Sequence, residues 1–365
     1  MCNNNQIIKI ARNFMRPIWY LLRNIMLKKR LGRIFNELTC MEAGNYNILL
    51  SEKIIIYKDS ARPFVNQFEI ISKDFFKHLP SIKIKINKNL RTSFCGQIAM
   101  LTTNNDLKIF DIKNNQVLSL LDIVSKERFH NTYEIFQGKL AMPYLFDTNE
   151  GIVERIIQNI SRSTWGHDLI IRNYLCILSD QRDYLKTATI AYEITFSDIW
   201  ENIQKFQFTR LNKIARQITE KINDTYSMPC VFLHRDIHFG NTLFDGRQLY
   251  YIDFEYADNE VFFYDIFNCI FVEFILNRDS LLLSLYLKKD GDMFANLYEI
   301  FNIMGVNFNE KSYLDYLYIF LLARLRFTCV MLVKNTKYKQ MRTLKAEIEH
   351  FSMFLNYVEE YENKI

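Results

Sequence analysis

The sequence predicts an α+β protein with a small mixed N-terminal lobe around an antiparallel sheet and a larger helical C-terminal lobe. Alternating apolar and polar residues between about residue 46 and residue 156 are typical of strands. Apolar residues spaced three and four apart from 160 to 228, and again from 265 onward, indicate helices. All five prolines precede residue 230, so the C-terminal third of the chain contains no proline to break a helix.

The first segment, residues 1–36, contains eight Lys and Arg residues and no acidic residue. Arg16 and Arg23 interrupt its apolar stretches, which excludes a secretory signal and a membrane-spanning helix. A basic amphipathic helix of this composition is typical of peripheral contact with an anionic membrane, to which each basic residue contributes about 1 kcal/mol. The alternative is a helix that packs on the protein with its basic residues facing water.

Residues 37–157 form the predicted N-terminal lobe, with an extension at its start. The predicted elements are a hairpin at 47–59, a helix at 65–79, a strand at 82–89, a hairpin at 106–121, a helix at 125–137, and strands at 141–146 and 151–157. The turn of the second hairpin is expected at Asn114 and Asn115.

Residues 158–365 form the predicted C-terminal lobe, which is helical except for a strand-rich stretch at 230–254. Its most apolar part is 313–335, which is long enough to suggest a membrane span. Arg324 and Arg326 interrupt this part, and a core helix is therefore the preferred interpretation.

Composition excludes several classes of protein. With 49% hydrophobic and 24% charged residues, the chain is neither disordered nor a disulfide scaffold. Its net charge of +5 is too small to imply a nucleic-acid partner. The seven cysteines include no Cys-x-x-Cys pair, which predicts neither a disulfide framework nor a zinc site and favours a reducing, cytoplasmic location.

The stretch 230–267 contains the residues best suited to catalysis. An apolar strand leads into a loop that contains Asp236, and Asn241 follows five residues later. A hairpin turning at Asp245 and Gly246 then presents Asp253 at its end. Two carboxylates and an amide oxygen suit Mg²⁺, and Asp236 is placed to accept a proton from a hydroxyl. This is the layout that phosphoryl transfer requires.

The pattern His-x-Asp-x-x-x-x-Asn at 234–241, followed by Ile-Asp-Phe-Glu at 252–255, resembles the aminoglycoside phosphotransferase and choline kinase group of the protein-kinase-like superfamily. The resemblance implies a bilobal kinase-like fold that uses ATP and Mg²⁺. It implies Asp236 as the catalytic base and Asn241 and Asp253 as the metal ligands.

The resemblance also suggests roles for residues around this core. The lobe at 37–157 would bind the nucleotide, and the lobe at 158–365 would hold the catalytic residues and the acceptor. His234 would brace the loop, and Asp265 resembles the later aspartate that buttresses it in this group. His238 and Glu255 have either a functional or a purely structural interpretation.

The N-terminal lobe departs from the kinase pattern, because the sequence contains no Gly-x-Gly motif. Two lysines, Lys108 and Lys58, are candidates for the contact to the nucleotide phosphates. In the preferred alignment the helix at 125–137 is the orienting helix, and Lys108 must serve because the following strand, "QVLSLL", has no lysine. In the alternative, Lys58 pairs with Glu69.

These features predict an ATP- and Mg²⁺-dependent kinase that phosphorylates a hydroxyl of a small molecule or of a cell-envelope sugar, as in lipopolysaccharide or capsule assembly. The expected partners are therefore a nucleotide and a small-molecule or glycan acceptor. A choline or ethanolamine kinase is one alternative, favoured by the segment "IDFEYA". The other is a catalytically silent kinase-like module that binds a partner or a membrane.

Overall fold

A computed structural model describes residues 40–50, 54–67, 82–86, 94–101, 107–121, 123–148, 151–222, 227–334 and 337–364. The basic segment 1–36 lies outside these residues, as does most of the helix predicted at 65–79. The chain divides into two compact units. One comprises residues up to Glu127 together with Tyr144–Ile156, and the other comprises Arg128–Pro143 together with the chain from Ile157 onward.

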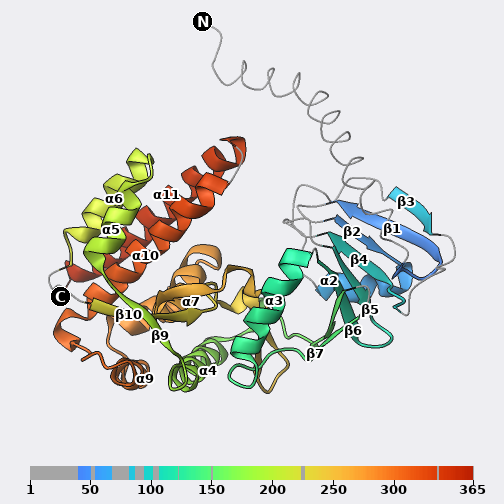
Figure 1. Ribbon diagram of the computed structural model, residues 1–365, viewed down its shortest axis with the longest axis horizontal. Helices are drawn as coiled ribbons and strands as arrows, with labels where there is room; N and C mark the ends of the chain where they lie inside the picture. The colour runs from blue at the N-terminus through green and yellow to red at the C-terminus, as the bar shows by residue number, and fades with distance from the viewer. Residues whose placement is uncertain are drawn as a thin grey trace, which may run out of the picture. The chain divides into compact units, whose positions relative to one another are not determined.

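The first unit is built on an eight-stranded sheet with the order β3-β1-β2-β4-β5-β6-β8-β7 (Figure 1). Its strands are β1 (Gly44–Leu50), β2 (Ile54–Tyr57), β3 (Ile82–Ile86), β4 (Ile98–Leu101), β5 (Leu107–Asp111), β6 (Gln116–Leu120), β7 (Leu145–Asp147) and β8 (Ile152–Arg155). All neighbouring strands are antiparallel. A short 3-10 turn, η2 (Asp59–Ala61), and the helix α2 (Arg62–Gln67) follow β2.

Both predicted hairpins are confirmed. β1 pairs with β2, and β5 pairs with β6 across a turn in which Asn115 has a φ of 57°. Asparagine tolerates this left-handed conformation better than most residues, which explains its place in the turn. β6 leads into helix α3 (Ile123–Phe136), and β7 and β8 follow. This is the succession of strand, helix and strands that the preferred sequence alignment requires.

Two apolar clusters cover the two faces of this sheet. Successive residues of a strand point to opposite faces, and Ile109 and Phe110 accordingly belong to different clusters. Leu118 joins the cluster of Ile109, whereas Val117 joins that of Phe110. The sheet is therefore buried on both sides, which explains why several of its strands contain continuous apolar runs.

Glu42 anchors the start of this sheet through three hydrogen bonds. Its carboxylate accepts from Lys58 Nζ at 2.5 Å, from Lys113 Nζ at 2.6 Å and from Gln97 Nε2 at 2.8 Å. Burial raises the pKa of Glu42, but the hydrogen bonds from Lys113, Lys58 and Gln97 outweigh it and lower the pKa to about 2. Glu42 is therefore ionised in the folded protein at any moderately acidic pH.

We expect Glu42→Gln to destabilise the protein by about 1–3 kcal/mol at pH 7, because the two lysines lose a charged acceptor. A folded-state pKa of about 2 against an ordinary 4.5 gives stability that is present above pH 4.5 and lost as the pH falls toward 2. Urea unfolding of parent and variant from pH 7 down to pH 3 should thus show a difference that shrinks below pH 4.5. The exposed Glu134→Gln is the control, and a pH-independent difference would refute the ionic role.

The second unit is mainly helical. Its helices are α4 (His167–Leu185), α5 (Phe196–Gln204), α6 (Thr209–Thr219), α7 (Tyr264–Leu276), α8 (Leu281–Leu287), α9 (Gly291–Ile303), α10 (Tyr313–Lys334) and α11 (Lys337–Glu362). They surround a small sheet in which β10 (Ser227–Leu233) lies between β9 (Ile190–Thr195) and β13 (Asp258–Val261). A separate two-stranded hairpin is formed by β11 (Thr242–Phe244) and β12 (Leu249–Tyr251).

The strand-rich stretch predicted at 230–254 is confirmed, but β9 and β13 were not predicted. β9 lies at an edge of its sheet, and four of its six residues are exposed, so it lacks the buried alternating face that marks a strand in sequence. Helix α5 begins directly after it with a capping box between Thr195 and Asp198.

One large hydrophobic cluster holds the second unit together, and α7 and α10 lie at its centre. In the described part of the chain, the stretch Glu310–Val333 is the one helix long and apolar enough to cross a membrane by length and composition. However, 67% of its most apolar window is buried inside the structure, which confirms the prediction of a core helix. The six described cysteines are all free.

Candidate active site

β10 brings the candidate catalytic residues to the end of a buried strand. It is the central strand of its sheet, and Cys230, Val231 and Leu233 are fully buried. The chain leaves the sheet at His234 and turns sharply at Arg235, whose φ is 63°. This left-handed conformation is unusual for a residue other than glycine and is held by the surrounding contacts. Asp236 follows directly after the turn.

Asp236 and Asn241 are joined by direct hydrogen bonds. The Asn241 side-chain amide donates to Asp236 Oδ2 at 2.8 Å and to the Asp236 backbone carbonyl at 3.1 Å. The short 3-10 turn η4 (Phe239–Asn241) brings the two residues back together. Because the Asn241 amide nitrogen is used in these bonds, its amide oxygen is left to act as a ligand.

Two hydrogen bonds connect this loop to the residue just before Asp253. The Ile252 amide donates to the Asn241 carbonyl at 3.1 Å, and His234 Nε2 bonds to the Ile252 carbonyl at 2.9 Å. Asp253 itself adopts a left-handed conformation with a φ of 67°. The loop after β10 and the end of the β11–β12 hairpin are thus fixed to each other, and Asp236, Asn241 and Asp253 lie on these two joined segments.

His234 is buried and lies beside Phe254, with ring centroids 4.4 Å apart. Burial lowers its pKa, so the neutral ring serves as a hydrogen-bonding brace between the two segments. His238 also turns inward, and its Nδ1 accepts a hydrogen bond from the Gly240 amide at 3.0 Å. Burial lowers the pKa of His238 to about 4, which leaves it neutral at pH 7 and supports a loop-bracing role.

Two fully buried polar residues of helix α7, Asp265 and Asn268, form hydrogen bonds with the loop. Asp265 Oδ1 accepts from the Ile237 amide at 3.4 Å, and Asn268 Nδ2 donates to the Ile237 carbonyl at 3.1 Å. Burial raises the pKa of Asp265 to about 7, against the backbone hydrogen bonds from Arg235 and Ile237 that lower it. Asp265 therefore holds both residues that flank Asp236.

Asp236 itself is mostly buried, with 20% of its side chain exposed. Burial raises its pKa, whereas the positive charge of Arg324, whose Nη1 lies 3.9 Å from Asp236 Oδ1, lowers it. The negative charge of Asp253 raises it again. A desolvated carboxylate of raised pKa, next to a second carboxylate, is the environment typical of a catalytic base.

A buried ion-pair network that was not predicted from the sequence lies beside the loop. Glu260 on β13 is fully buried, and Arg326 on α10 donates to both of its carboxylate oxygens at 2.6 and 2.7 Å. Arg235 lies 3.6 Å from the same carboxylate, and its guanidinium stacks over the Phe327 ring with 4.8 Å to the centroid. This network ties the residue before Asp236 to the core helix α10.

The donor set fits a divalent cation. Among the described residues no group of three or more His, Cys, Asp and Glu side chains could hold a metal ion by itself. Asn241 and Asp253 can supply one amide oxygen and one carboxylate oxygen. Mg²⁺ commonly binds only one or two such protein oxygens and completes its coordination with phosphate oxygens and water. The site therefore suits a cation that arrives with a nucleotide.

Lys108 lies in the first unit, on β5. It stands directly opposite Ser119 of β6, the strand that precedes α3. Lys58, the other candidate, forms an ion pair with Glu42 at 2.5 Å. Glu69, the partner proposed for Lys58, lies outside the described residues.

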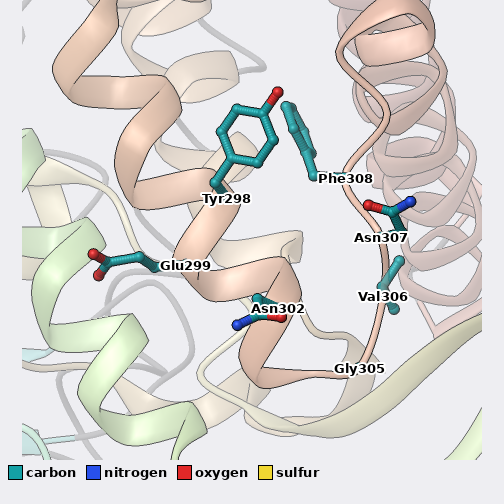
Figure 2. Close-up of a pocket in the computed structure, with 7 residues that line it drawn as sticks. All are labelled: Tyr298, Glu299, Asn302, Gly305, Val306, Asn307 and Phe308. Atoms are coloured by element: carbon teal, nitrogen blue, oxygen red, sulfur yellow. The ribbon is translucent and has the colours of Figure 1, made fainter.

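A surface hollow of about 550 Å³ lies at the end of α9, and none of the residues 234–253 lines it (Figure 2). It is lined by Tyr298, Glu299, Asn302, Gly305, Val306, Asn307 and Phe308. Its one carboxylate, on Glu299, is already paired with Arg182 at 2.8 Å. Nothing in this hollow resembles a phosphoryl-transfer site.

Comparison with known proteins gives a family match for residues 197–299, to the phosphotransferase enzyme family known as APH. The matched segment contains the whole loop from His234 to Asn241 and also Asp253 and Asp265. It confirms the resemblance found on the sequence motif and the expectation of a kinase. No curated protein is similar enough to the chain to count as a match.

Several solved structures are similar to the chain at low identity. Choline kinase LicA from Streptococcus pneumoniae is 12% identical, with 69% of this chain and 90% of that chain covered at a TM-score of 0.43. Amicoumacin kinase hAmiN, solved with AMP-PNP, Ca²⁺ and Ami, is 12% identical, with coverages of 71% and 85% and a TM-score of 0.42. Aminoglycoside phosphotransferase APH(4)-Ia is 13% identical, with coverages of 69% and 89% and a TM-score of 0.42.

Proposed function

We propose that the protein transfers the γ-phosphoryl group of ATP, in a Mg²⁺-dependent reaction, to a hydroxyl of a small molecule or a cell-envelope sugar. The observation that carries this proposal is the hydrogen-bonded connection of Asp236, Asn241 and Ile252, the residue before Asp253. The resemblance assigns Asp236, Asn241 and Asp253 to phosphoryl transfer, and these residues come from two chain segments that the fold joins.

In the proposed reaction, Asp236 accepts a hydrogen bond from the acceptor hydroxyl and takes its proton as the oxygen attacks phosphorus. Asn241 holds Asp236 by one oxygen at 2.8 Å, which leaves the other oxygen for the acceptor. The Asn241 amide oxygen and the Asp253 carboxylate would hold Mg²⁺, which when bound neutralises charge on the phosphates. Proton removal by a positioned base contributes about 10²–10⁴ to such rates.

Lys108 is the proposed contact to the nucleotide phosphates. In kinases this lysine lies on the strand that precedes the orienting helix. Here that strand is β6, which has Ser119 rather than lysine at the position facing Lys108. Side chains directly opposite on antiparallel strands lie about 5 Å apart at Cβ. The long side chain of Lys108 on β5 can therefore reach the position that a lysine in place of Ser119 on β6 would occupy.

The acceptor class is the part of the proposal that needs a direct screen. We expect label transfer from γ-labelled ATP to one class among heptoses, hexoses, aminoglycosides and lipid-linked sugars. Transfer to choline or ethanolamine would instead establish the amino-alcohol alternative. A protein that is not stabilised by millimolar Mg²⁺-ATP and transfers no label would be the silent kinase-like module.

The basic composition of residues 1–36 supports a cytoplasmic protein at the inner face of a membrane, close to a lipid-borne acceptor.

The metal role of Asp253 gives a separate prediction. Asp253→Ala should weaken Mg²⁺-ATP binding at least tenfold, about 1.4 kcal/mol, because one of two protein ligands is lost. Binding of ATP in the presence of EDTA should change much less. Thermal shift titrations under both conditions measure this, with Asp292→Ala on the exposed start of α9 as the control. An equal loss with and without Mg²⁺ would contradict the assignment.

A further inference from the structure

The apolar helix α10 contains two arginines, Arg324 and Arg326, that its role as a core helix does not require. Arg326 is accounted for by its ion pair with the buried Glu260. Arg324 lies two residues earlier, and only 15% of its side chain is exposed. Placing a guanidinium in a hydrophobic core is costly unless specific contacts compensate for it.

The contacts of Arg324 lead to the catalytic loop. Its Nη1 donates to Asn268 Oδ1 at 3.0 Å, and the Asn268 amide in turn donates to the carbonyl of Ile237 at 3.1 Å. Ile237 is the residue after Asp236, so this chain of two hydrogen bonds joins α10 through α7 to the catalytic loop. The same Nη1 lies 3.9 Å from Asp236 Oδ1, within ion-pair distance but beyond a hydrogen bond.

Aromatic rings fix the guanidinium in this position. It lies 5.5 Å from the centroid of Phe327 and 5.8 Å from that of Phe271. Phe327 also packs against the Arg235 guanidinium, on the other side of Asp236 in sequence. The charge of Arg324 also acts on Glu347 of α11. Burial raises the pKa of Glu347, but the hydrogen bond with His350 and the charge of Arg324 outweigh burial, so this pKa is lowered.

We propose that Arg324 is a positioning residue for Asp236, an inference that rests on the proposed function. Its charge attracts Asp236 Oδ1 without forming the hydrogen bond that would use this oxygen, and its bond to Asn268 holds the backbone that carries Asp236. The acceptor hydroxyl can therefore bond to an oxygen that is already oriented. Small displacements of such a group are costly in rate, because the reacting atoms must be aligned.

Arg324→Lys and Arg324→Gln test this role, with Arg342→Gln on the exposed face of α11 as the matched control. Lysine keeps the charge but lacks the planar set of donors that reaches Asn268 while facing Asp236. For both variants we expect kcat to fall at least tenfold while the KM for ATP changes less than threefold. The control should keep both constants within twofold of the parent.

Hydrogen exchange of the peptides covering 234–244 provides a measurement that does not depend on activity. We expect faster exchange there in both Arg324 variants and parent-like exchange in the control. Unchanged exchange, or a kcat within twofold of the parent, would overturn the proposal, as would an equal loss of Mg²⁺-ATP binding and turnover.

If the parent transfers no phosphate to any acceptor, the proposed function has failed, and exchange alone decides whether Arg324 holds the loop. Should the Gln variant not fold, the Lys variant decides.

Discussion

We expect Asp236→Asn to fold normally and to bind Mg²⁺-ATP like the parent. Its phosphoryl-transfer rate should fall by a factor of about 10²–10⁴. The amide oxygen can still accept the hydrogen bond that Asn241 donates to Asp236 Oδ2. The substitution also removes a charge whose burial raises the pKa of Asp236, so stability should not suffer. What the variant lacks is a group able to take the proton from the acceptor hydroxyl.

Three measurements make this prediction decisive: the thermal midpoint, the stabilisation by Mg²⁺-ATP, and label transfer at saturating acceptor. Asp245→Asn is the matched control, because Asp245 caps the exposed turn of the neighbouring hairpin by accepting from the Arg247 and Gln248 amides. It should retain transfer within twofold of the parent. An Asp236→Asn protein that turns over at nearly the parental rate would show that Asp236 is not the base.

The largest expected effect on stability is that of Glu260→Ala. The substitution leaves Arg326 and Arg235 without their buried counter-charge, although only 15% and 12% of their side chains are exposed. Breaking such a buried pair by removing one partner costs about 3–5 kcal/mol. Chemical denaturation measures this cost, and we expect the same variant to disturb the turn at Arg235 and to lower transfer.

Glu299→Ala is the control for Glu260, since it removes a carboxylate from an exposed pair with Arg182 in which 60% of the Glu299 side chain is exposed. Exposed pairs contribute about 0–1 kcal/mol. If both variants lose the same free energy of unfolding, burial of the Glu260 network is not what makes it stabilising.

The sequence predicted the strand, loop and hairpin at 230–254 better than their surroundings. Asp236, Asn241 and Asp253 lie within eighteen residues of one another in a strand, loop and hairpin, and local signals such as the Asp245–Gly246 turn define those elements. The hydrogen bonds that join Asp236, Asn241 and Ile252 follow from this short-range structure. The alternation and helical periodicity of the remaining chain were likewise sufficient to predict the α+β class.

The residues that sequence reasoning missed act over long distances along the chain. Glu260 meets Arg326, and Asn268 meets Arg324, across 66 and 56 positions. The two arginines in the apolar segment 313–335 were the available signal, and they were used only to reject a membrane span. A buried arginine implies a buried partner, but only the packing of α10 against α7 and β13 identifies which one.

The central claim is that Asn241 and Asp253 hold divalent cations beside Asp236, and a structure of the protein with Mg²⁺ and a non-hydrolysable ATP analogue tests it most directly. We predict cations about 2.0–2.1 Å from the Asn241 amide oxygen and an Asp253 carboxylate oxygen, with Asp236 facing the terminal phosphate. Nucleotide bound with its phosphates away from these side chains, or cations coordinated by other residues, would contradict the account.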